Sequence, residues 1–139
     1  MGYSAPMFSP TGGVKISAHD LAQYMIMHMN YGQLNGVRII SEESARQMQT
    51  PVWIAQKKGE DQYGLCLEEF LNMVDDPRYL QPGHYLVGHT GSAYGLRSVM
   101  IWSPQDRWGI VARVSGYTWQ KDEDVLHALV NAIYGVAGF

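Results

Sequence analysis

The sequence has a single cysteine, Cys66, among its 139 residues. One thiol cannot form a disulfide within the chain, and no second cysteine supplies the spacing of a thiolate metal site. Charged residues are also sparse, at 17%, and ten Lys and Arg against thirteen Asp and Glu leave a formal charge of -3 without any basic run. Because a phosphate backbone is bound by clustered cations, this composition argues against a nucleic-acid partner.

Long apolar runs are absent as well, since no stretch reaches the roughly 18 residues that a membrane-spanning helix needs. The first eight residues, MGYSAPMF, hold neither the basic segment nor the apolar segment of a signal peptide. The sequence therefore predicts no membrane span, and any targeting signal would lie upstream of Met1. The compartment stays unknown at this point.

What is present is a globular composition. Hydrophobic residues make up 46% and aromatic residues 12% of the chain, which excludes the low-hydropathy composition of a disordered protein. The length fits one domain, and no repeat, low-complexity tract or long linker divides it. We therefore treat residues 1–139 as a single domain.

Helix signals occur near both ends of the chain. Ser17 followed by Asp20 resembles a capping box, and apolar residues at helical spacing then predict a helix over 18–31 that stops at Gly32. A shorter helix should begin at Ser41 and end before Pro51. An apolar stripe from Val125 to Ile133 predicts a C-terminal helix that ends at Gly135.

Between these helices the pattern changes to that of strands. Apolar and β-branched runs bounded by turn residues predict strands over 63–67, 85–88, 96–102 and 108–115, the last two as an antiparallel hairpin. The fold class is thus α+β, with an antiparallel sheet of three to four strands and helices packed on it, including the C-terminal helix. A single helix covering such a sheet would leave part of a face or an edge unpaired, which predicts an incomplete domain that can pair with other chains, for example as a homo-oligomer through the open edge.

The segment His89-Thr90-Gly91-Ser92 follows a predicted strand and opens a glycine-rich stretch that runs to Gly95. These glycines let a ligand approach the backbone, and a strand edge there presents N–H groups to an oxyanion or a carboxylate. The imidazole and the adjacent hydroxyl add a proton carrier and a donor. The segment is our candidate site, although an ordinary turn beside a strand explains the same residues.

Four stretches, in matching order and spacing, add to this interpretation. They are Pro10–Ala22 with its glycine pair, Ile39-Ile40-Ser41 with Met48 and Pro51, Tyr63-Gly64-Leu65, and Gly88–Ser92 through Gly95. Together they resemble the C-terminal part of the serine β-lactamase and penicillin-binding-protein-like hydrolase family, nearest to its class C-like branch. The resemblance covers essentially the whole chain and implies a partial β-lactamase-like fold.

In that family, a Lys or His followed by Thr or Ser and then Gly lies on the strand that borders the acyl-transfer site. By resemblance, His89 and Ser92 are the catalytic residues: His89 brings polarity or positive charge, and the backbone N–H of Ser92 completes an oxyanion hole. Thr90, as a hydroxyl donor, and Gly91 would bind substrate. The resemblance implies no cofactor, and its substrates are β-lactams, D-amino-acid peptides or esters.

The family's nucleophile box, Ser-x-x-Lys, is missing, because no serine in the chain has Lys three residues later. The Tyr-x-Asn box is missing too. We therefore expect a C-terminal fragment of a hydrolase that is inactive alone, and that is periplasmic or secreted if the parent carries an upstream signal peptide. The alternative is a non-catalytic module of the same fold that binds a peptide or another protein through its open edge.

Two further interpretations carry less weight. His84 and His89, with Asp75 and Asp76 upstream, match no standard zinc signature, so we predict no metal site. Arg97 and Arg113 on adjacent predicted strands could hold a carboxylate bidentately, but arginines on an outer sheet face are more often simply solvated.

Overall fold

The computed structural model describes residues 14–53, 62–71, 85–93, 95–116 and 123–138. Several sequence features fall outside these ranges, namely the Gly12-Gly13 pair, the Asp75-Asp76-Pro77 and Pro82-Gly83 turns, and His84. No helix within the described ranges is long and apolar enough to cross a membrane.

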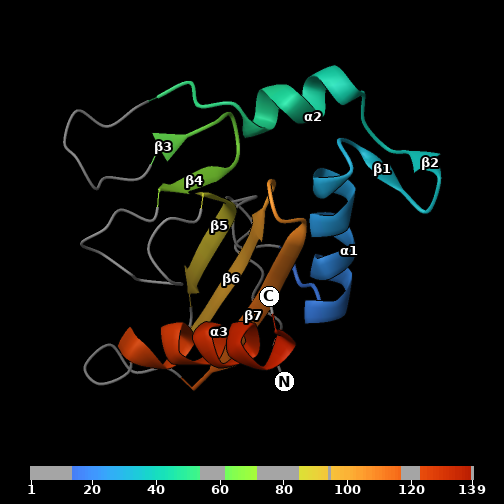
Figure 1. The fold of residues 1–139 in the computed structure, drawn as a ribbon. Helices are drawn as coiled ribbons and strands as arrows, with labels where there is room; N and C mark the ends of the chain where they lie inside the picture. Colours follow the sequence, from blue (N-terminus) through green and yellow to red (C-terminus); the bar gives the residue numbers. More distant parts are fainter. Residues whose placement is uncertain (1–13, 54–61, 72–84, 94, 117–122, 139) are drawn as a thin grey trace.

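The chain folds around a five-stranded antiparallel sheet in the order β3-β4-β5-β6-β7 (Figure 1). The strands are β3 (Gln62–Tyr63), β4 (Glu68–Leu71), β5 (Tyr85–Ala93), β6 (Leu96–Ser103) and β7 (Trp108–Ser115). The helices are α1 (Ala18–Met29), α2 (Glu42–Gln49) and α3 (Glu123–Ala137). The predicted α+β class, with an antiparallel sheet and a C-terminal helix, is confirmed.

The first two helices begin where their capping residues predict. The Ser17 side chain accepts a hydrogen bond from the backbone N–H of Asp20, and that of Ser41 accepts one from Ser44, so each satisfies a free donor of the first turn. The sequence analysis missed the small hairpin between them, β1 (Gln33–Leu34) and β2 (Val37–Arg38). Its turn is Asn35-Gly36, and both residues have positive φ (49° and 81°).

Several predicted boundaries are wrong. The helix expected over 18–31 ends at Met29, and the strand expected over 85–88 continues to Ala93. Of the strand expected over 63–67, only Tyr63 lies in a strand, β3. Residues 64–67 form a turn to β4, closed by a hydrogen bond from the Gly64 N–H to the Leu67 carbonyl. The sheet therefore gains one short strand beyond the expected three to four. Gly135 does not end α3, which continues to Ala137 and is followed by Gly138 at φ 72°. A glycine in this left-handed conformation is the usual helix terminator.

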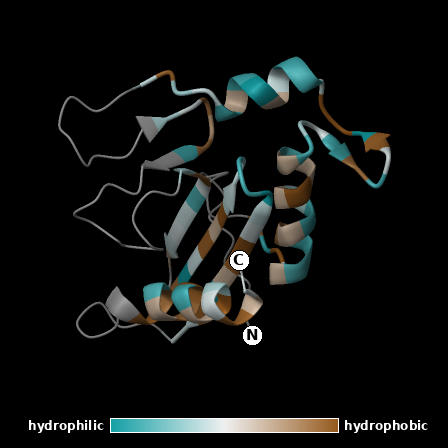
Figure 2. Cartoon of the chain, in the orientation of Figure 1, coloured by the Kyte–Doolittle hydropathy of each residue, from teal (hydrophilic) through white to brown (hydrophobic). Residues whose placement is uncertain are grey.

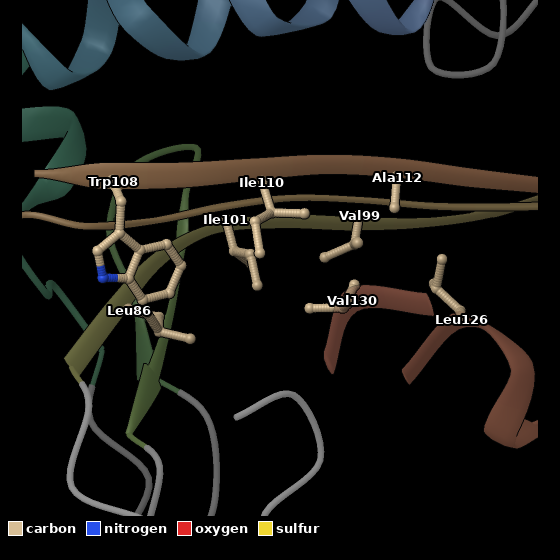
Figure 3. Close-up of a cluster of buried hydrophobic side chains, with 8 residues drawn as sticks. All are labelled: Leu86, Val99, Ile101, Trp108, Ile110, Ala112, Leu126 and Val130. Atoms are coloured by element: carbon tan, nitrogen blue, oxygen red, sulfur yellow. The ribbon is translucent and has the colours of Figure 1, made fainter. Parts of the chain in front are cut away.

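One face of the sheet packs on α3. Figure 3 shows side chains from β5, β6 and β7 pointing toward Leu126 and Val130 of the helix. The sheet contributes Leu86, Val99, Ile101, Trp108, Ile110 and Ala112 to this cluster. Full burial of an aliphatic side chain of this size stabilises the fold by about 1.5–3 kcal/mol. This face is the larger hydrophobic core.

The opposite face packs on α1, which corrects the expectation of a single covering helix. Val87, Met100 and Trp102 alternate with the residues of the first cluster, so they point to the other side of the sheet and meet Met25. Apolar and polar residues accordingly alternate along both α1 and α3 (Figure 2). Helices therefore pack on both faces of the sheet, chiefly over β6 and β7.

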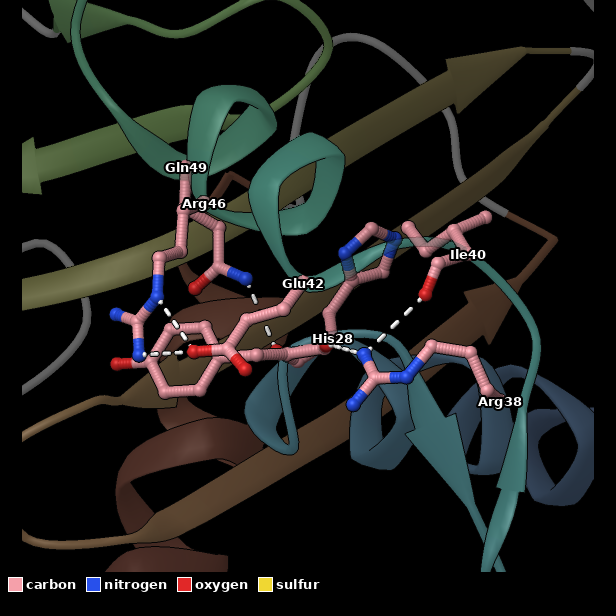
Figure 4. Close-up of polar contacts among 7 residues, drawn as sticks. His28, Arg38, Ile40, Glu42, Arg46 and Gln49 are labelled. Atoms are coloured by element: carbon pink, nitrogen blue, oxygen red, sulfur yellow. Dashed lines mark hydrogen bonds and ion pairs between the residues drawn. The ribbon is translucent and has the colours of Figure 1, made fainter.

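Polar contacts join the C-terminal end of α1 to α2 (Figure 4). The Gln49 side chain donates to the His28 carbonyl at 2.9 Å, and Arg38 donates to the carbonyls of Tyr31 and Ile40. The imidazole of His28 is fully buried, stacks on Trp102 at 6.1 Å between ring centroids, and has no hydrogen-bond partner among the described residues. Burial lowers the pKa of His28 from its ordinary value.

We predict that Gly88→Ala strongly destabilises the fold. A Cβ at this position would collide with the backbone carbonyl oxygen of Met100 on β6, so the two strands would have to separate. Overpacking of this kind lowers the free energy of unfolding by about 1–3 kcal/mol or more. The matched control is Gly135→Ala, where a Cβ meets nothing within 4 Å and a helical alanine is favoured by about 1 kcal/mol. Urea denaturation of both variants measures the difference, and equal midpoints would contradict it.

We also predict that the chain loses stability on mild acidification because of His28. Its pKa is lower in the folded than in the unfolded state, so the unfolded chain binds the proton more readily. The stabilisation is complete above the unfolded pKa of about 6.5 and is lost as the pH falls below it. The urea midpoint should therefore drop between pH 7.5 and pH 5, and it should drop less in His28→Phe. An identical drop in both proteins would exclude His28 as the cause.

Candidate functional site

The candidate segment His89–Ser92 lies on β5, where one neighbour of this strand ends and the other continues. β4 pairs with β5 only from Leu71↔Tyr85 to Glu68↔Gly88, whereas β6 pairs with it as far as Ala93↔Leu96. Beyond Gly88, therefore, no strand within the described residues covers the outer edge of β5. Along such an edge, alternate residues direct their N–H and C=O groups outward, where a ligand can pair with them.

A carboxylate lies beside this edge at the start of β4. Glu68 is only 6% exposed and accepts a hydrogen bond from the Tyr63 hydroxyl at 2.8 Å. The Thr90 hydroxyl donates to its other oxygen at 3.4 Å, and His89 Nε2 lies 3.9 Å from Glu68 Oε1. His89 Nδ1 contacts the carbonyl oxygen of Thr90. Glu68, Tyr63, His89 and Thr90 thus form one polar cluster, which we call the Glu68 cluster.

Two residues of the Glu68 cluster, His89 and Thr90, border a cavity of about 290 Å³ between α1 and the sheet, whereas Glu68 and Tyr63 are not among its lining residues. His89 and Thr90 line the cavity with residues of α1, the β3–β4 turn, β4 and β6, namely Leu21, Tyr24, Cys66, Leu67, Ser98 and Met100. A mostly apolar hollow with a few convergent polar groups is the usual form of a small-molecule site. The cavity therefore places His89 and Thr90 where a ligand can reach them.

The four predicted site residues do not all meet in this cavity. His89 and Thr90 line it, whereas Gly91 and Ser92 are absent from its lining. Gly91 lies opposite Ser98 on β6, and a Cβ there would come within 2.6 Å of the Ser98 hydroxyl oxygen. The Ser92 side chain is exposed and points to the opposite sheet face from His89, because side chains alternate along a strand. A catalytic contribution of Ser92 thus rests on its backbone N–H, which stays a prediction.

A second cavity of about 410 Å³ continues along the same face toward the N-terminal end of α1. It shares Leu21 and Ser98 with the first, and Ile16, Val111 and Arg113 line its far part. The Arg113 guanidinium donates to the carbonyl of Ile16 at 3.4 Å. The two hollows together extend from His89 to Arg113.

Arg97 and Arg113 cannot form the bidentate clamp that the sequence left open. Arg113 is paired with Ser98, the residue next to Arg97 on β6. Because neighbouring residues of a strand point to opposite faces, the two guanidinium groups lie on opposite sides of the sheet. A single carboxylate therefore cannot reach both.

Within the described ranges, no group of three His, Cys, Asp or Glu residues is placed to hold a metal ion. The zinc interpretation needed His84, Asp75 and Asp76, all of which lie outside those ranges. His89 itself faces a carboxylate and a backbone carbonyl.

Sequence reasoning missed Glu68 and Tyr63 as members of the site. Glu68 precedes Glu69 and resembles a solvated strand residue, although it directly follows the apolar run Leu65-Cys66-Leu67. Its burial depends on the Gly64–Leu67 turn, which folds β4 back so that Tyr63 and Glu68 stand opposite each other. A tyrosine and a glutamate flanking a tight turn were the signal available in the sequence.

The cavity geometry can be checked through Tyr24. Burial raises the pKa of Tyr24 above its ordinary value of 10.0, and the charge of Cys66 raises it further. In Cys66→Ser the negative thiolate is gone, so the pKa of Tyr24 should fall toward 10 but not reach it, because burial remains. A ¹³C-tyrosine NMR titration measures this change, with Ser115→Ala at the exposed end of β7 as control. An unchanged Tyr24 titration in Cys66→Ser would contradict the placement of these two groups.

Comparisons with known proteins leave the family open. No protein-family model matches the chain, and no curated protein matches its sequence. The family resemblance therefore remains a prediction that rests on the four sequence stretches.

Proposed function

We propose that this chain forms one wall of the acyl-transfer site of a serine hydrolase whose nucleophile lies outside these 139 residues. The observation that carries the proposal is the position of His89 and Thr90. They border a cavity at the point where β4 stops covering the edge of β5. The sequence resemblance supports the same conclusion, because the His-Thr-Gly segment corresponds to the family's third box.

The proposed acyl-transfer reaction uses the backbone N–H groups at the uncovered edge of β5. A serine hydroxyl from elsewhere in the parent would attack an amide or ester carbonyl, and water would then hydrolyse the acyl-enzyme. The N–H groups that point outward from residues 89–93 of β5 would stabilise the oxyanion of both steps. Loss of one oxyanion donor typically costs about 10²- to 10³-fold in rate. His89 would add polarity beside the carbonyl.

The chain alone should not turn over such substrates. No serine in the sequence has a lysine three residues later, so the activated hydroxyl of the family is missing. Removing the nucleophile of a serine hydrolase costs on the order of 10⁶-fold in kcat, and oxyanion donors do not replace it. A stable acyl adduct of the purified chain with a β-lactam, at any of its serines, would contradict the proposal.

The uncovered edge of β5 also supports a second candidate, a non-catalytic module. An extended peptide could add to residues 89–93 as a further strand, with its main chain hydrogen-bonded to β5. Such a module would bind ligand without acylation and would be stable by itself.

The first test is the intact mass of the native polypeptide that carries this sequence, detected with an antibody against the chain. We expect a product far heavier than 15.6 kDa that reacts with a fluorescent acylating probe such as a labelled penicillin or fluorophosphonate. In that polypeptide, His89→Ala should slow acylation by about 10²-fold, because the polar group beside the carbonyl is lost. His19→Ala, an exposed histidine in the first turn of α1, is the matched control. An unlabelled product near 15.6 kDa would favour the binding module instead.

A further inference from the structure

The second cavity, at the N-terminal end of α1, has no role in the proposed acyl transfer. Its volume of about 410 Å³ lies within the roughly 300–1,000 Å³ that is usual for small-molecule sites. The segment that leads into α1 forms one wall, and the strands β6 and β7 form the other. We call this hollow the Arg113 cavity, after the arginine in its lining.

The strand register places two polar side chains of the sheet on the α1 side, in the lining of this cavity. Val99 and Ala112 belong to the cluster that packs on α3. Ser98 and Arg113 are their neighbours along β6 and β7, so both point toward α1, because side chains alternate along a strand. The two are also paired directly across the strands, which brings their Cβ atoms to about 4.5–5.5 Å. A guanidinium and a hydroxyl therefore lie side by side in the cavity wall.

The lining carries positive charge. Arg113 and Lys15 are cations, and the described residues that line the cavity include no Asp or Glu. Within the described part of the chain, Arg113 donates to one group, the neutral carbonyl of Ile16 at 3.4 Å. Because a guanidinium has five N–H donors, several remain for a ligand. The charge of the wall therefore favours an anion.

The rest of the wall is mainly apolar. Leu21 of α1 lines the cavity together with Leu96 and Val111 of the strands. A hydrocarbon group that covers these side chains leaves water, which is favourable in proportion to the apolar area buried. A bare inorganic anion gains nothing from this part of the wall, whereas an amphipathic anion uses both parts.

From this lining we infer that the Arg113 cavity binds a small monocarboxylate with an apolar body, of the class of medium-chain fatty acids. The carboxylate pairs with the Arg113 guanidinium, whose planar fork matches it, and the Ser98 hydroxyl donates to it. The hydrocarbon chain covers the apolar part of the wall. The inference stands apart from the proposed hydrolase function, because it concerns binding and uses neither His89 nor an oxyanion hole.

Titration with hexanoate and with the neutral hexanamide tests this inference on the native polypeptide that carries this sequence. Amide ¹⁵N chemical shifts give the affinity and also locate the ligand, with the largest changes expected at Ala18, Ser98 and Arg113. Hexanoate should bind about three- to tenfold more tightly than hexanamide, because the arginine is exposed and solvent screens part of its charge.

In Arg113→Gln this difference should disappear, while hexanamide binds as before. Arg107→Gln is the matched control and should keep the wild-type difference. Arg107 is likewise exposed and donates to one oxygen, Oδ1 of Asn30 at 3.3 Å, but it lies at the other end of β7. Equal weakening of hexanoate and hexanamide in Arg113→Gln would assign the effect to the contact with Ile16, which shapes the wall, and would overturn the inference.

The apolar wall is tested by chain length. Affinity should rise about three- to fourfold for each methylene added from butanoate to hexanoate. Ala18→Leu fills part of the hollow and keeps a high helix propensity, so it should reduce this gain. Ala132→Leu makes the same change on the exposed surface of α3 and should not.

The inference is overturned if the wild type binds neither ligand or binds both equally, or if affinity does not change with chain length. Chemical-shift changes confined to the cavity beside His89 would overturn it as well. None of these results bears on the hydrolase proposal, which is tested by acylation.

Discussion

The unequal pairing of β5 with its two neighbours is the constraint on which the candidate site depends. β6 pairs with β5 from Val87 to Ala93, but the pairing of β4 with β5 stops at Glu68, opposite Gly88. Gly88 is where the three strands are in register, and a carbonyl of β6 fills the space that a Cβ would need. β5 is therefore paired on both sides at Gly88, and directly beyond Gly88 its edge toward β4 is uncovered. Backbone N–H groups that stabilise an oxyanion must be held in place and still be accessible, and this part of β5 meets both requirements.

Glu68 is the first residue of β4 and the last that pairs with β5 toward the candidate site. A buried carboxylate is costly unless donors surround it, and here the donors come from the edge strand through Tyr63 and from β5 through Thr90. The Gly64–Leu67 turn brings Tyr63 back to Glu68, so the local fold of β3 and β4 positions this carboxylate beside Thr90.

The sequence predicted those elements whose cause is local. Ser17 and Ser41 cap the helices that follow them, and the hairpin of β6 and β7 follows from two apolar runs around a turn. It did not predict that α1 covers the second sheet face, because helical periodicity shows that a helix has an apolar side but not what that side meets. Asn35-Gly36 was missed since its strands have only two residues each. His89 and Thr90 were found from their glycine-rich surroundings, whereas Glu68 needed the tertiary contact that buries it.

α1 connects the stability of the fold to the shape of the cavity. Leu21 and Tyr24 form part of the cavity wall, and one turn further along the same helix Met25 and His28 pack on the core at Trp102. His28 also meets the edge of the Tyr24 ring at 4.6 Å between centroids. A proton on His28 would place a charge in this core without any acceptor from the described residues. The position of α1, and with it the cavity wall, therefore depends on the packing of a neutral His28 imidazole. His28 lies outside the cavity but affects the candidate site beside His89 through this helix.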